Sequence, residues 1–138
     1  MFAPRMLSVI PDYSGQQPSQ VPDEFGRPLE ITPDPAQMAE LRPRVIEALR
    51  QVYDPEIPVN IYELGLVYDV LVDADGRVGI RMTLTAPACP AAPTLPGEVR
   101  DRARAVEGVT GAQVEIVFDP PWSMERMTDA ARLQLGLL

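Results

Sequence analysis

The sequence predicts an α+β domain of two layers, with helices covering one face of a small mixed β-sheet. Two observations predict this class. Apolar residues recur three or four positions apart in two long segments, as on one face of a helix, and they alternate with other residues in three short segments, as in half-buried strands. The predicted order of elements is α-β-β-α-β-α. The chain has 138 residues, which is enough for one domain with its own core.

Proline is concentrated in the first part of the chain. Seven of the 16 prolines lie within the first 40 residues, among glycine, serine and glutamine. Such a composition does not support a helix or a core, so residues 1–41 are predicted to form an irregular arm and residues 42–138 the domain. Deleting residues 1–40 is then expected to shift the thermal midpoint by only a few degrees. Four apolar residues of the arm are candidates to hold it against the domain: Val21, Phe25, Leu29 and Ile31.

The first predicted helix begins at Pro43, because proline is favoured in the first turn of a helix. It ends at Asp54, where the prolines at positions 55 and 58 cannot continue the hydrogen-bond ladder. Its apolar face is formed by Val45, Ile46, Leu49, Val52 and Tyr53.

A β-hairpin is predicted next, with strands over residues 66–72 and 78–84 and a turn over residues 73–77, which include two aspartates and a glycine. One face of the hairpin is apolar and is predicted to pack on both long helices. The residues that define this face are Val70, Val72, Ile80 and Met82.

Three further elements follow the loop over residues 86–93. Residues 95–106 carry an apolar stripe at helical spacing, and Gly108 ends this helix. Residues 112–118 alternate as a third strand. A short terminal helix is predicted over residues 128–136, with a threonine N-cap and a glycine C-cap.

The charge and composition exclude several classes of function. Twenty acidic residues against 12 arginines give a net charge of −8, which disfavours binding to nucleic acid or to an anionic membrane. The chain has neither histidine nor lysine, so it lacks a Ser–His pair, a P-loop lysine and every histidine metal ligand. A single cysteine permits no internal disulfide, and no apolar run reaches about 20 residues. We predict no signal peptide, because the first ten residues are followed by proline and aspartate. We therefore expect a cytoplasmic location.

Cys89 is the first candidate for chemistry, because it follows a strand, precedes a helix and is flanked by Pro87 and Pro90. Backbone N–H groups at the start of a helix favour a thiolate, which can bind a soft metal or act as a nucleophile. The alternative is a small buried apolar residue. An iron–sulfur cluster usually takes four protein ligands, so the remaining ligands must come from a second protomer, a partner or external thiols.

Two pairs of polar residues are further candidates. The hydroxyl groups of Thr83 and Thr85 can donate hydrogen bonds to sulfide, thiolate or another anion, or these residues are ordinary strand threonines on a solvated face. Asp54 and Glu56 lie in a proline-rich turn. Their carboxylates suit hard metal ions or acid–base chemistry, whereas stabilisation of the turn explains Asp54 equally well.

Several motifs then give the chain a family resemblance. DPEIPVNIYELGLVY (residues 54–68), MTLTAPACP (82–90) and FDPPW (118–122) stand in the same order as in the SufT-like iron–sulfur assembly family, together with Arg126-Met127 and ARLQLG (131–136). This family includes bacterial proteins encoded with the SUF machinery and a domain of eukaryotic cytosolic iron–sulfur targeting factors. The resemblance covers about residues 42–138.

The resemblance implies a fold related to the C-terminal domain of NifU-type scaffolds and a role in maturing or delivering iron–sulfur clusters, without enzymatic turnover. It implies that Cys89 is the functional cysteine and a candidate ligand of iron or of a labile cluster, with Asp54, Glu56, Thr83 and Thr85 as supporting residues. The implied partners are an iron–sulfur scaffold or carrier and client apoproteins. A homodimer would bring two Cys89 thiolates together.

Two other functions stay open from the sequence. The chain is also similar to PaaD-type accessory proteins of aromatic-ring monooxygenases, but those typically add a cysteine-rich C-terminal segment, and none follows here before Leu138. A cysteine enzyme such as a thiol transferase is the third alternative. It would have to work without a resolving cysteine and without a histidine or lysine base.

Overall fold

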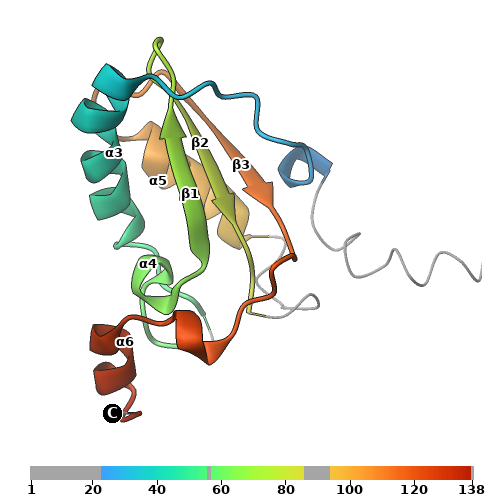
Figure 1. Cartoon of the computed structure of the whole chain (residues 1–138), viewed down its shortest axis with the longest axis vertical. Coiled ribbons are helices and arrows are strands. Elements are labelled where there is room, and N and C mark those ends of the chain that lie inside the picture. Colours follow the sequence, from blue (N-terminus) through green and yellow to red (C-terminus); the bar gives the residue numbers. More distant parts are fainter. Residues whose placement is uncertain (1–22, 56, 86–93, 138) are drawn as a thin grey trace, which may run out of the picture.

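A computed structural model describes residues 23–55, 57–85 and 94–137, and within them it confirms the predicted α+β class (Figure 1). The strands form one three-stranded mixed sheet, and the two long helices cover the same face of it. In chain order the elements are the 3-10 helix η2 (Asp23–Phe25), α3 (Pro35–Leu49), α4 (Ile61–Leu64), β1 (Val67–Val72), β2 (Arg77–Met82), α5 (Leu95–Arg104), β3 (Gly111–Ile116), the 3-10 helix η3 (Met124–Arg126) and α6 (Asp129–Gln134).

The central strand of the sheet is β2. It pairs with β1 in antiparallel register, with Ile80 opposite Val70, and with β3 in parallel register, with Ile80 opposite Val114. The parallel pair is joined through α5, which returns the chain to the starting end of the sheet, as parallel strands require. As a result, β1 begins and β2 and β3 end at the same end of the domain.

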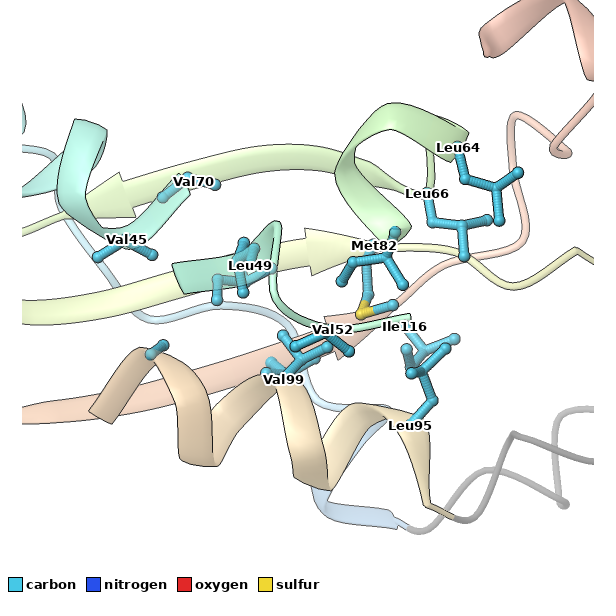
Figure 2. Close-up of a cluster of buried hydrophobic side chains, with 14 of the residues drawn as sticks. Val45, Leu49, Val52, Leu64, Leu66, Val70, Met82, Leu95, Val99 and Ile116 are labelled. Carbon is cyan, nitrogen blue, oxygen red and sulfur yellow. The ribbon is translucent and has the colours of Figure 1, made fainter. Parts of the chain in front are cut away.

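The core lies between the sheet and the two long helices, as the alternation of the hairpin predicts. α3 packs on β1, α5 packs on β3, and the two helices contact each other. Figure 2 shows side chains of α3 and α5 meeting those of the strands in this layer. The four hairpin residues predicted to face the helices are at most 2% exposed: Val70, Val72, Ile80 and Met82.

The hairpin turn is held by one aspartate. The carboxylate of Asp73 accepts hydrogen bonds from the backbone N–H groups of Asp75 and Arg77, both at 2.9 Å. The bond from the Arg77 N–H lowers the pKa of Asp73, since it favours the charged carboxylate. Because the folded-state pKa is lowered, this stabilisation is present at neutral pH and is lost as the pH falls through that pKa.

The first helix ends at Leu49 and not at the predicted Asp54, so Val52 and Tyr53 lie beyond it, and Tyr53 is 55% exposed. Two further features of the first half of the domain differ from the sequence prediction. α3 begins at Pro35, eight residues before the predicted start at Pro43, because the Asp34 side chain caps it by accepting from the Gln37 N–H at 3.0 Å. The predicted start is therefore wrong, and Pro43 lies inside the helix, where it is exposed to solvent. The second difference is the short helix α4, which the sequence pattern does not predict and which is capped by the side chain of Asn60.

The described part of the N-terminal segment lies against the domain. Phe25 is only 3% exposed, and the Arg100 guanidinium lies 5.4 Å from the centre of its ring. The chain then crosses the sheet face opposite the helices (Figure 1), and a Cβ atom on Gly79 would lie 2.6 Å from Ile31. Three of the four predicted anchor residues thus contact or enter the domain, and Val21 lies outside the described residues. The predicted boundary at residue 41 falls inside α3.

We expect residues 23–34 to stabilise the domain, in contrast to the sequence-based expectation for residues 1–40. Deleting residues 1–34 removes the burial of Phe25 and the N-cap of α3. Allowing for the entropy that ordering this segment costs, the net loss is about 2 kcal/mol, or several degrees in thermal midpoint. The matched control is deletion of residues 1–22, which we expect to leave the midpoint within about 2 °C. Equal midpoints for the two truncated chains in differential scanning calorimetry would contradict the prediction.

The described helices do not meet the requirements for a membrane-spanning helix. Within residues 23–55, 57–85 and 94–137, no helix combines the length and the apolar character that crossing a membrane requires.

Candidate functional site

The described candidate residues gather at one end of the domain. At this end α3 and β2 finish, and α5 and β1 start (Figure 1). Asp54 lies in the connection between α3 and α4, and Thr83 and Thr85 follow directly after β2. The topology therefore brings two sequence motifs about 30 residues apart to the same end of the sheet.

Asp54 closes the turn between α3 and α4. Its side chain is buried, and Oδ2 accepts a hydrogen bond from the Ile57 N–H at 2.8 Å. Its own N–H donates to the carbonyl of Val59 at 3.2 Å. The turn-stabilising role considered for Asp54 is therefore confirmed. Glu56, the second carboxylate of the pair, lies outside the described residues.

Thr83 occupies an unusual environment for a residue at a strand end. It is 1% exposed, and its backbone N–H donates to the carbonyl of Leu66 at 2.8 Å. Within the part of the chain that the structure describes, its buried Oγ1 has no hydrogen-bond partner. The interpretation as a solvated strand threonine is therefore wrong for Thr83, because the chain just beyond β2 remains enclosed. Thr85, two residues on, is half-buried.

A buried hydroxyl without a partner costs about 1–3 kcal/mol in desolvation, and such groups are uncommon in native proteins. The buried hydroxyl of Thr83 therefore lowers the stability of the fold. A thiolate, sulfide or carboxylate brought to it would accept the hydrogen bond that it can donate.

The position of Cys89 itself lies outside the described residues. The residues that flank residues 86–93, Thr85 and Thr94, both lie at the end of the sheet that carries Thr83. α5 begins at Leu95, six residues after Cys89, and its N-cap residue Thr94 makes no side-chain capping bond. Among the described residues, no three carboxylates or thiols come together as a metal site. The cysteine remains a predicted ligand.

Thr83→Val tests the environment of this hydroxyl. Valine has nearly the shape of threonine without the hydroxyl, so we expect the free energy of unfolding to stay unchanged or to rise by up to about 1 kcal/mol. Thr128→Val is the matched control, since Thr128 caps α6 by accepting from the Ala131 N–H at 3.1 Å. That variant is expected to lose about 1 kcal/mol. A loss above about 1 kcal/mol for Thr83→Val in urea unfolding would show that its hydroxyl is already satisfied.

One feature of this end is not predicted from the sequence. A concave pocket of about 580 Å³ opens on the sheet face opposite the helices, and its lining includes Tyr68, Arg81, Asp119 and Arg126. Arg126 belongs to a motif that the sequence analysis used only for the family resemblance. No periodic pattern in the sequence indicates the pocket, because it forms where three segments distant in sequence meet.

Comparison with known proteins assigns the family. Residues 42–116 match the sequence model of a family described as "Iron-sulfur cluster assembly protein". The chain belongs to this family. The matched residues contain both motifs at the candidate site, the one with Asp54 and the one with Thr83, Thr85 and Cys89.

Curated members of the iron–sulfur assembly family are similar over most of their length. The chain is 50% identical over 94 residues to a Porphyromonas gingivalis protein named Fe-S protein maturation auxiliary factor, covering 68% of this chain and 90% of that protein. It is 37% identical over 86 residues to the maturation auxiliary factor SufT of Staphylococcus aureus, covering 62% and 98%. The SufT-like resemblance is thus confirmed.

Two further comparisons concern the fold and the alternative function. The structure resembles a domain of unknown function from Bacillus anthracis with a TM-score of 0.71 and 35% identity, covering 76% of this chain and 100% of that domain. The chain is also 42% identical over 88 residues to an Escherichia coli protein named as a putative component of 1,2-phenylacetyl-CoA epoxidase. The match covers 63% of this chain and 52% of that component, so the accessory-protein branch is related at the level of the domain.

Proposed function

We propose that this chain is an iron–sulfur maturation factor of the SUF type, which aids the formation of clusters or their delivery to client proteins through the thiol of Cys89. The observation that carries the proposal is the 50% identity to a maturation auxiliary factor over nearly all of that factor's length. The iron–sulfur cluster is cargo in this function and is held only transiently.

The chemistry of transfer is ligand exchange. The Cys89 thiolate replaces a thiolate of the scaffold at iron, and a thiolate of the client then replaces Cys89; no electron is gained or lost. Sulfur of this kind is the ligand that iron–sulfur clusters take. A chain with one cysteine supplies one ligand, so the others come from the scaffold, the client or a second copy of this chain.

Asp54, Thr83 and Thr85 are the described supporting residues of this proposal. Asp54 fixes the turn between α3 and α4, through its bond from the Ile57 N–H, and Glu56 is the second carboxylate of the same sequence motif. The buried hydroxyl of Thr83 is available to donate to a thiolate or sulfide, which would lower the negative charge on sulfur. Thr85 is the second hydroxyl of the same motif. In this proposal none of these groups turns over a substrate, and the protein acts as a carrier and not as an enzyme.

The proposed setting is the cytoplasm, where a reducing environment keeps a single cysteine as a thiol. The proposed partners are an iron–sulfur scaffold or carrier and client apoproteins. A homodimer with two Cys89 thiolates at one cluster is a further part of the proposal.

An accessory role in an aromatic-ring monooxygenase complex is the second candidate, and the similarity to the epoxidase component favours it. Genomic neighbourhood discriminates between the two. Scaffold and cysteine desulfurase genes beside this one support maturation, and genes for ring-oxygenase components support the accessory role.

Anaerobic reconstitution tests the proposal directly. The purified chain is incubated with iron, sulfide and thiol, and cluster formation is followed by absorbance and bound iron. Loaded protein is then mixed with an apoprotein whose activity requires a cluster. We expect wild type to load and to transfer, and Cys89→Ala to do neither, whereas Thr83→Val loads more weakly. Equal loading and transfer by Cys89→Ala would overturn the proposal.

A further inference from the structure

The pocket on the outer face of the sheet has a defined floor. Asp69 of β1 and Arg81 of β2 form it on the side of the sheet away from the core, together with Val67 of β1, which also packs against the edge of the core. Further along the same face, the N-terminal segment covers Gly79 with Leu29 and Ile31. The pocket therefore occupies the part of this face that the described N-terminal segment leaves open.

Hydrogen bonds and close backbone packing connect the segments that surround the pocket. The Tyr68 hydroxyl donates to the carbonyl of Pro120 at 2.7 Å, and both residues line the pocket. Just outside the lining, the indole N–H of Trp122 donates to the carbonyl of Leu64 at 2.8 Å. Gly65 has φ of 88°, and a Cβ atom there would collide with the backbone carbonyl of Arg126. Only glycine allows this close approach of two segments. A pocket with fixed walls loses little entropy when it binds a ligand.

The charges that line the pocket are only partly balanced. Arg81 donates to Glu115 at 3.1 Å and to Asp69 at 2.8 Å, and these bonds raise its pKa. In contrast, neither Arg126 nor Asp119 forms an ion pair within the described residues. The Arg126 guanidinium lies 4.7 Å from the centre of the Tyr68 ring. The pocket therefore presents, among the residues that the structure describes, one unpaired cation and one unpaired carboxylate.

The remaining lining is largely apolar or aromatic and includes Tyr62, Val67, Val117 and Pro120. The lining therefore carries charges of both signs, and a simple anion or a simple cation would complement only one of them. A ligand with both charges and an apolar part complements the pocket. The pocket is open to solvent, and its volume of about 580 Å³ is sufficient for a few residues of an extended peptide.

We propose that this pocket binds an extended segment of a partner polypeptide, with an acidic side chain at Arg126, a basic side chain at Asp119 and an apolar residue between them. Complementary charges of this kind select a partner and fix its direction in the groove. The inference rests on the proposed function only in naming the partner as a scaffold or client. The pocket lies near the end of the sheet that carries Thr83. A partner protein bound through this segment is therefore held beside the proposed transfer site.

The test uses the full chain as bait for a randomised library of short peptides displayed on phage. We expect enrichment of peptides with one acidic and one basic residue on either side of an apolar or aromatic residue. A synthetic peptide of the enriched sequence is then measured by fluorescence anisotropy. Arg126→Glu and Asp119→Arg should each weaken binding about tenfold, because attraction becomes repulsion. Arg102→Glu on the exposed side of α5 is the control and should bind like wild type.

Exchanging the charges at positions 119 and 126 is the decisive part of the experiment. The double variant Arg126→Glu/Asp119→Arg should lose the original peptide and bind the peptide whose acidic and basic residues are exchanged. Binding should also weaken with rising salt. Enrichment without opposite charges, or equal binding by Arg126→Glu, would overturn the proposal. The Cys89→Ser variant separates this inference from the proposed function: it should keep the peptide affinity of wild type while losing cluster transfer.

Discussion

Ile80→Ala is expected to lower the free energy of unfolding by about 4 kcal/mol, which is near the upper part of the range for buried aliphatic residues cut to alanine. Ile80 is fully buried, and it lies on the central strand with Val70 opposite on β1 and Val114 opposite on β3. The layer it faces is closed on the other side by α3 and α5 (Figure 2). A cavity at this point cannot be filled by the movement of a loop or an edge strand, so most of the packing loss remains.

Equilibrium unfolding in urea measures this loss, with circular dichroism and tryptophan fluorescence as two probes of the same transition. Leu133→Ala is the matched control, because Leu133 lies on the short helix α6 and is 67% exposed. Its variant should stay within about 0.5 kcal/mol of wild type. A similarly small change for Ile80→Ala would mean that the core face of the hairpin has been assigned to the wrong side.

The elements predicted correctly from the sequence are those that local pattern determines. The alternation around Val70 and Ile80 gives the hairpin and its buried face, because a strand turns successive side chains to opposite sides. Thr128 is recognisable as the N-cap of the terminal helix for a similar reason, since a capping hydroxyl and the N–H from which it accepts are three residues apart.

The features that the sequence does not predict depend on contacts between distant segments. Two prolines suit a helix start equally well, and only the cap by Asp34, whose N–H also bonds the carbonyl of Val72, places that start at Pro35. The burial of Thr83 arises from the enclosure of the chain just beyond β2, which residue type does not reveal. The pocket at Arg126 forms only when the chain after β3 packs on Gly65. The proposed function follows from whole motifs and not from any one of these residues.

Cys89→Ser is expected to abolish iron–sulfur loading and transfer while changing stability little. A serine hydroxyl stays protonated at neutral pH, so it cannot supply the soft anionic sulfur that iron or a cluster binds. The two prolines that flank Cys89 favour a shaped loop over a core strand, and the family match places this residue within a cluster-assembly domain. If Cys89 were instead a core residue, the new hydroxyl would cost about 1–3 kcal/mol in apolar surroundings.

Two measurements on the Cys89→Ser variant distinguish a metal ligand from a core residue. Urea unfolding reports whether the side chain belongs to the core, and anaerobic loading followed by transfer to an apoprotein reports whether its sulfur is a ligand. Thr83→Val is the companion variant, because it changes a buried hydroxyl at the same end of the sheet and leaves the thiol in place. We expect it to reduce transfer less than Cys89→Ser does, since a hydrogen bond to sulfur tunes a ligand whereas the thiolate is the ligand. A Cys89→Ser protein that loads iron and matures its client as well as wild type would refute the ligand role, whatever its stability.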